Sequence, residues 1–410
     1  MNPAIQGLVT IIVGVGGCIA YFYFSNQILD KVIFPATGKH AGRNISRANM
    51  VRPWLFLAPA IFALGLYLAY PVVETLRLSL TDRDLGGAFV GLANYQQMMD
   101  EPKFWEALRN NFLWLLVVPA FATAFGLLAA QLTDRLSWGN IAKSLIFMPM
   151  AISFVGAAVI FRLIYVARPE DQAQIGVLNA VWLQFQGGGG SFIFLKILPA
   201  IILVCFAALS AYVVYLVIKP YLQGYKRGGL LAHLGRVIIA VGGLYLAFLA
   251  LRSTLTLFGA ELPYGEPQQW LTIPFYNNFF LMVVLIWIQT GFAMVILSAA
   301  LRGIPEETVE AAIVDGANPF EVFFQIKVPQ IMGTIVVVWT TITLTVLKVF
   351  DIVFAMTNGQ WETQVLANYM FDKLFRANDW GVGSASAIVI MLLVSPILIW
   401  NVYNARKEMR

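Results

Sequence analysis

Long runs of apolar residues dominate the pattern of this chain, and short polar segments separate them. A helix of about 20 apolar residues crosses the hydrocarbon core of a bilayer, so each run of that length predicts a transmembrane helix. Nine such helices are predicted, over residues 4–24, 54–76, 110–132, 144–166, 193–218, 237–258, 276–300, 331–353 and 385–404. The pattern therefore predicts an all-α polytopic membrane protein.

Composition supports this prediction and excludes a water-soluble protein. Hydrophobic residues make up 59% of the 410 residues and charged residues 12%, whereas soluble proteins have roughly 45–50% and about 25%. Cys18 and Cys205 lie inside apolar runs and are expected to be packing residues. The chain contains no phosphate-binding G-x-x-x-x-G-K-[ST] loop, no metal-binding motif and no catalytic motif. Neither a metal site nor an enzymatic activity is predicted.

Lysine and arginine collect on one side of the predicted spans, and cytoplasmic loops are enriched in these residues. Sixteen of them lie in segment 25–53, after the third, fifth and seventh spans, and at the C-terminus, whereas the alternate loops hold eight. This distribution predicts an N-terminus outside the cell and a cytoplasmic C-terminus.

The cytoplasmic segment 301–330 has the signals of two short helices. Gly316 suits the left-handed conformation that ends a helix, and Asn318 followed by Glu321 is a capping-box pattern for a second helix. The second helix places Phe320, Phe323 and Phe324 on one face. Large aromatic residues on such a helix indicate either an interfacial helix that contacts lipid or a docking surface for another protein.

The same segment strongly resembles the EAA loop of permease subunits of binding-protein-dependent ABC importers. The resemblance rests on Glu310-Ala311-Ala312, on Gly316 four residues later, and on Pro329. In that family this loop docks on the ATP-hydrolysing subunit, so the resemblance favours docking over lipid contact. It implies a coupling role for Glu310, Ala311, Ala312, Asp315, Gly316, Phe320, Phe323 and Pro329.

The resemblance extends over residues 54–185 and 262–404 and indicates the maltose-type subfamily. Segments 147–154 and 348–353 look most like those of α-glucoside permeases. It implies a type I ABC importer permease core with an inserted helix pair, which follows Gly187–Gly190. The expected divisions are an N-terminal span and basic segment (1–53), a first part of the core (54–185), the inserted pair (186–261) and a second part of the core (262–410).

By this resemblance the chain is a permease subunit that carries an α-glucoside or related oligosaccharide across the bacterial inner membrane by alternating access. It binds no cofactor itself, and a separate ATPase uses ATP and Mg²⁺. The implied partners are a second permease, two ATP-binding subunits, an extracytoplasmic sugar-binding protein, the sugar and membrane lipid, with no nucleic acid.

A self-contained, ion-coupled secondary sugar transporter is the alternative. This alternative assigns ion coupling to Lys348 and Asp351. Their spacing places them on one face of a predicted helix, where they neutralise each other. The same two residues also suit a polar lining of a sugar path.

Sugar recognition needs hydrogen-bonding groups and aromatic faces in a concave site. In maltose-type permeases this site uses the two helices that flank the EAA loop. The corresponding positions in this chain are Trp287, Gln289, Thr290, Thr345, Val346 and Val349.

Overall fold

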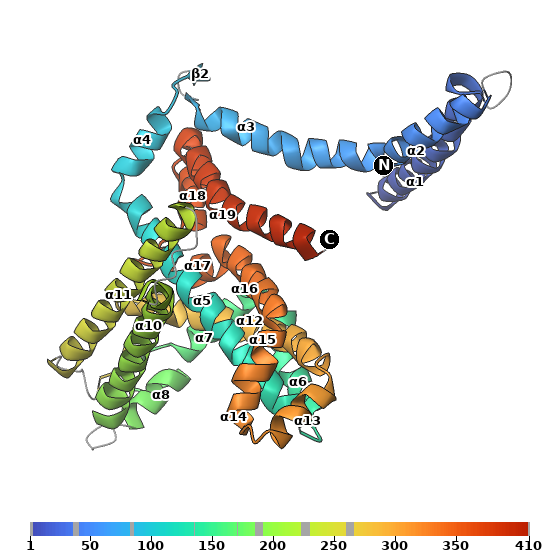
Figure 1. The fold of residues 1–410 in the computed structure, drawn as a ribbon. Coiled ribbons are helices and arrows are strands. Elements are labelled where there is room, and N and C mark those ends of the chain that lie inside the picture. The colour runs from blue at the N-terminus through green and yellow to red at the C-terminus, as the bar shows by residue number, and fades with distance from the viewer. Residues whose placement is uncertain are drawn as a thin grey trace. The chain divides into compact units, whose positions relative to one another are not determined.

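The computed structural model describes residues 3–35, 41–82, 86–134, 136–169, 171–184, 192–222, 230–259 and 266–408. Helices make up most of the described chain (Figure 1), which confirms the all-α prediction. Two-residue strands β1 (Thr81–Asp82) and β2 (Ala88–Phe89) pair antiparallel. Contacts divide the chain into one unit of residues 1–105 with 369–410 and a second unit of residues 106–368.

The first unit holds both ends of the chain. Its helical elements are α1 (Pro3–Ile28), η1 (Leu29–Ile33), α2 (Ala41–Leu64), η2 (Gly65–Ala69), α3 (Tyr70–Ser79), α4 (Ala93–Asp100), η6 (Asp372–Arg376) and α19 (Trp380–Glu408). Arg52 on α2 donates to both carboxylate oxygens of Asp30 on η1, at 2.6 and 2.8 Å. Glu101 pairs with Lys373 and accepts a hydrogen bond from the Tyr369 hydroxyl at 2.8 Å. These contacts join segments that are far apart in the sequence.

The second unit contains the long helix α5 (Pro102–Asp134), which begins just before it, and the central helix α12 (Tyr276–Arg302). Its other elements are α6 (Gly139–Phe147), η3 (Met148–Ala151), α7 (Phe154–Ile164), α8 (Val177–Gln184), η4 (Ile193–Ile197), α10 (Leu198–Leu222), α11 (Leu230–Gly259), α13 (Glu306–Val314), α14 (Pro319–Glu321), η5 (Val322–Lys327), α15 (Val328–Gln330), α16 (Met332–Leu347), α17 (Asp351–Met356) and the first half of α18 (Leu366–Phe371), which continues into the first unit. Large apolar side chains of α12 are fully buried on several faces, because α6, α7, α16 and α17 all contact it. A helix that is apolar all round belongs in the interior.

The fourth predicted span, over residues 144–166, is a bent helix pair. Helices α6 and α7 meet at 102°. Pro149 lies in the 3-10 turn η3 and cannot continue an α-helix, and Ser153 caps α7 by accepting a hydrogen bond from the Gly156 N–H at 3.1 Å. Local sequence therefore makes the bend, although the apolar run alone predicted one straight helix.

The eighth predicted span, over residues 331–353, is interrupted between α16 and α17. Phe350 has φ −135° and ψ −56°, which is outside the helical range. Lys348 follows the last residue of α16, and Asp351 is the first residue of α17. The prediction that both lie on one helix face is therefore wrong, and the ion pair assigned to them as an ion-coupling device loses its geometric basis.

The inserted segment forms two helices, α10 and α11, that pack along each other. Ala207, Ala247 and Ala250 are buried between them, and a Cβ atom at Gly243 would lie 2.6 Å from a Val214 methyl carbon. Small residues allow membrane helices to approach closely. The tetraglycine Gly187–Gly190 and the boundary near residue 261 lie outside the described residues.

The predicted count of nine membrane helices is not confirmed. Within the described residues, six helices are long and apolar enough to cross a membrane, or up to eight if each bent pair is one span. The last apolar stretch of α19, residues 380–396, is shorter than the other spans. The four predicted divisions, with boundaries at residues 53, 185 and 261, stay predictions. The two units are defined by contacts within each of them and do not test these boundaries.

Candidate functional site

The segment that resembles an EAA loop begins with α13, which carries Glu310, Ala311 and Ala312. Gly316 has φ +90°, which glycine adopts without strain. The Ala317 N–H donates to the Ala312 carbonyl at 3.0 Å, and the Gly316 N–H donates to the Ile313 carbonyl at 3.0 Å. This pair of bonds is a Schellman motif, so the turn after α13 forms as the sequence predicted.

The second helix starts at Asn318 and runs without a break through α14, η5 and α15 to Gln330. The Asn318 side chain accepts hydrogen bonds from the N–H groups of Phe320 and Glu321, both at 3.0 Å. The Glu321 carboxylate accepts from the Asn318 N–H at 2.8 Å, which completes the capping box. The helix ends one residue after Pro329.

Apolar side chains of this helix–turn–helix are exposed. Val314 is 86% exposed, Phe320 76% and Phe324 62%; we call these three residues the docking face. Phe323 is half-buried and packs edge-on against Phe324, with ring centroids 4.9 Å apart. Phe323 therefore supports Phe324 from a less exposed position than the three residues of the docking face.

Ionic contacts hold the membrane helices together beside this loop. One carboxylate oxygen of Asp134, at the end of α5, accepts from Lys143 of α6 at 3.1 Å and from Arg302 of α12 at 2.8 Å. Lys143 also donates to the Ser298 hydroxyl at 2.6 Å. A cavity of about 410 Å³ lies between these helix ends and the loop, and Asp134, Arg302, Glu310 and Lys327 line it. The ends of α5, α6 and α12 are therefore joined by ionic contacts beside the cavity that the loop also lines.

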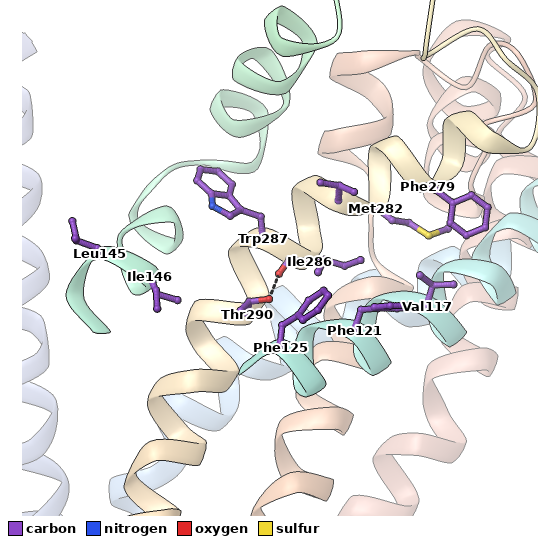
Figure 2. Close-up of a pocket in the computed structure, with 11 residues that line it drawn as sticks. Val117, Phe121, Phe125, Leu145, Ile146, Phe279, Met282, Ile286, Trp287 and Thr290 are labelled. Carbon is purple, nitrogen blue, oxygen red and sulfur yellow. Dashed lines mark hydrogen bonds between the residues drawn. The ribbon is translucent and has the colours of Figure 1, made fainter. Parts of the chain in front are cut away.

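A cavity of about 700 Å³ lies where α12 meets α5 and α6 (Figure 2). Helix α12 contributes Phe279, Met282, Val283, Ile286, Trp287 and Thr290, helix α5 contributes Val117, Phe121 and Phe125, and helix α6 contributes Leu145 and Ile146. Trp287 also packs against Phe161 of α7, with ring centroids 5.3 Å apart. The Thr290 hydroxyl donates to the Ile286 carbonyl at 2.7 Å. The walls are almost wholly apolar, so this surface can contact a ring face but offers few hydrogen bonds.

The structure brings two of the six predicted path residues, Trp287 and Thr290, to this cavity. Gln289 is buried elsewhere on α12, because residues two apart on a helix point in nearly opposite directions. Thr345 is half-buried and donates to the Thr341 carbonyl at 3.2 Å. Val346 and Val349 are buried in the hydrophobic core. These four residues lie away from the cavity.

Sequence reasoning missed the aromatic wall that α5 supplies. Phe121 and Phe125 are four residues apart and therefore share one face of that helix. The spacing was readable, but it did not indicate which helix this face would meet.

No family model matches the chain. The chain is 52% identical over 412 residues to the alpha-glucoside transport system permease protein AglF of Rhizobium meliloti (strain 1021), and the match covers 100% of this chain and 99% of that protein. It is 35% identical over 358 residues to the osmoprotective compounds uptake permease protein GgtC of Synechocystis sp., with 87% of this chain and 100% of that protein covered.

Solved structures show the same fold. A bacterial ABC transporter involved in the import of the acidic polysaccharide alginate contains a chain with a TM-score of 0.59 and 15% identity, covering 91% of this chain and all of that one. A structure of a bacterial alginate ABC transporter in complex with an alginate pentasaccharide-bound periplasmic protein gives a TM-score of 0.58, also at 15% identity, covering 91% of this chain and 99% of that one.

Proposed function

The chain belongs to the permease subunits of sugar ABC importers, and from this premise we propose that it carries an α-glucoside or related oligosaccharide across the bacterial inner membrane. The observation that supports coupling to a separate ATPase is the docking face, which is ordered by a capped helix–turn–helix and left exposed. Large exposed aromatic residues on an ordered element favour a protein interface. The 52% identity to a permease named for alpha-glucoside transport supports the substrate class.

The mechanism is alternating access. ATP and Mg²⁺ act in the two partner ATPase subunits, and closure of that dimer pushes on the loop from Glu310 to Pro329. The Asp134–Lys143–Arg302 contacts then pass the movement to α5, α6 and α12 together. The remaining partners are a second permease, which supplies the opposite wall of the path, and an extracytoplasmic sugar-binding protein.

The helix break between Lys348 and Asp351 removes the shared helix face on which the ion-coupling pair of a secondary transporter was based. Family membership also assigns the energy source to another subunit.

We place one wall of the sugar path at the cavity that Trp287 and Thr290 line. The Trp287 ring offers an apolar face for the axial hydrogens of a glucose unit, and its indole N–H is a donor. Because the walls in this chain are mostly apolar, the partner permease must supply most of the hydrogen bonds.

Replacing Trp287 by alanine is expected to lower α-glucoside uptake about tenfold, because losing the aromatic contact to the sugar costs roughly 1.4 kcal/mol. The measurement is uptake of maltose, sucrose and trehalose by the reconstituted complex, with lactose, a β-galactoside, as the comparison sugar. Trp287→Phe keeps a ring and should retain most of the activity. If wild type and Trp287→Ala took up every α-glucoside equally, Trp287 would not line the sugar path. A wild-type complex that transports no α-glucoside would refute the substrate class.

We propose the orientation that the basic residues indicate, with the N-terminus outside and the C-terminus cytoplasmic. This orientation places the docking face in the cytoplasm and the loop after α7 outside. Three predicted spans lie between these positions, so they must face opposite sides of the membrane.

Single cysteines should report this orientation after Cys18 and Cys205 are replaced by alanine. Val314→Cys is expected to react with an impermeant maleimide only in inside-out vesicles, and Ala173→Cys only in right-side-out vesicles. Both side chains are exposed, so access to reagent depends on sidedness rather than burial. Reaction of both from one side would contradict the proposed topology.

A further inference from the structure

A second pocket lies at the end of α12 opposite the docking face. It has a volume of about 270 Å³, and its lining includes Arg162, Tyr165, Gln269, Trp270, Thr272 and Trp361; we call it the outer pocket. Helix α12 has 27 residues and is therefore about 40 Å long. In the proposed orientation the outer pocket faces the extracytoplasmic side, whereas Trp287 lies within the membrane.

Trp361 is held in place by a strained turn. Its φ is +53°, and that of Glu362 is +61°, a conformation that costs roughly 1–2 kcal/mol for each L residue other than glycine. The Asn277 amide donates to the Trp361 carbonyl at 2.6 Å. The Asn110 and Asn278 amides donate to the Glu362 carbonyl at 2.8 and 3.2 Å. These three asparagines are buried, so the turn is fixed although its backbone is strained.

Trp361 is 45% exposed, so the fixed turn does not serve to bury its side chain in the core. Strained backbone persists where the surrounding structure enforces it, and such positions occur often at ligand sites. An exposed aromatic ring on a rigid support is a prearranged contact surface.

The polar groups around this ring are donors with unused capacity. Arg162 makes one long hydrogen bond, to the Ala355 carbonyl at 3.5 Å, and a guanidinium has five N–H donors. The Gln269 side chain is exposed. The Tyr165 hydroxyl already donates to the Phe280 carbonyl at 3.0 Å, so it orients this wall and adds no unused donor. Trp270 is buried and packs edge-on against Trp182, with ring centroids 5.1 Å apart, which makes that wall rigid.

These features fit a pyranose ring better than other ligands. Aromatic faces pack against its C–H groups, and planar guanidinium and amide groups bind its hydroxyls. Among the described residues no carboxylate lines the pocket, which disfavours a cation there. The volume is just below the range of about 300–1,000 Å³ that is usual for larger ligands, so one sugar ring fits.

We propose that the outer pocket is an additional sugar site, which receives one glucosyl unit before the sugar reaches the membrane-embedded path. The proposal rests on the proposed sugar-transport function but concerns a separate set of residues. It assigns Trp361 the stacking contact and Arg162 and Gln269 the contacts to hydroxyls.

Protection from alkylation tests the proposal at this pocket alone. Ala167 lines the pocket without contributing a polar side chain, so Ala167→Cys, in a background with Cys18→Ala and Cys205→Ala, reports occupancy. The assembled complex in nanodiscs is treated with a methanethiosulfonate reagent, and the rate of modification is measured in the presence of methyl α-D-glucopyranoside. The comparison compound is sorbitol, which has hydroxyls but no ring. The expected result is at least threefold slower modification with the glucoside and no change with sorbitol. Ala173→Cys, in the same loop, should show no protection.

Removing the ring should remove the protection. Trp361→Leu, added to the Ala167→Cys background, is expected to raise the glucoside concentration that gives half-maximal protection at least tenfold. Trp361→Tyr, or Trp138→Leu at a remote exposed position, should change that concentration less than threefold. Equal protection in wild type and Trp361→Leu would overturn the proposal. Protection by the purified binding protein, with none by the sugar alone, would also overturn it and identify a protein contact instead.

Uptake by the same complex separates this proposal from the proposed function. Wild-type transport of α-glucosides with no sugar protection of Ala167→Cys would refute only the outer pocket. A wild-type complex with neither α-glucoside transport nor protection would refute both.

Discussion

Replacing Glu310 by lysine is expected to lower α-glucoside uptake more than about a hundredfold while the permease still inserts in the membrane. Glu310 is exposed on α13 and lines the cavity that also contains Arg302 and Lys327. A lysine there adds a third positive charge to this cavity and reverses the charge on the surface that we propose docks on the ATPase. Like charges brought together at an interface cost several kcal/mol, and about 3 kcal/mol corresponds to a factor above one hundred.

The fold should survive this change. Lysine and glutamate have similar helix propensities, and the Glu310 side chain makes no hydrogen bond or ion pair within the described residues. The measurement is co-purification of the ATPase subunit together with uptake in vesicles.

Glu307→Lys is the matched control, because Glu307 is exposed on the same helix but does not line the cavity. It should retain ATPase association and most of the transport. Normal uptake by Glu310→Lys at normal expression would show that this residue has no part in coupling.

Replacing Gly291 by valine is expected to disrupt the packing of the second unit. A Cβ atom at Gly291 would lie 2.6 Å from the Ile146 carbonyl oxygen and 3.0 Å from the Phe147 Cα, both backbone atoms of α6. Backbone cannot rotate away as a side chain can, so the change should destabilise the protein by about 3 kcal/mol, the upper end of the cost of overpacking. Helix α12, which carries Trp287, would separate from α6, which carries Lys143.

Thermal unfolding of the purified chain in detergent measures this effect. The Gly291→Val variant should melt about 5 °C or more below wild type and should lose uptake. Gly242→Val is the control, because no atom lies within 4 Å of a Cβ placed at Gly242. An unchanged melting temperature for Gly291→Val would show that α6 and α12 are not in this contact.

Local sequence determined the helix–turn–helix and most helix positions. Gly316 and the Asn318–Glu321 capping box predicted the turn and the start of the second helix, and both form as expected. Such signals are readable because a cap or a left-handed glycine depends on residues only a few positions apart. Apolar runs likewise placed α1, α5, α10, α11 and α12 close to their predicted ranges.

Only the tertiary structure decided which side chains meet. Trp287 and Thr290 face a cavity, while Gln289 between them is buried on another side, because α5 and α6 rather than α16 form the opposite walls. The outer pocket joins Arg162, Gln269 and Trp361, which are far apart in the sequence. The left-handed turn at Trp361 and Glu362 receives hydrogen bonds from Asn277, Asn110 and Asn278, which lie on other helices. Contacts of this kind depend on the distances between segments, which a hydrophobic pattern along one chain does not contain.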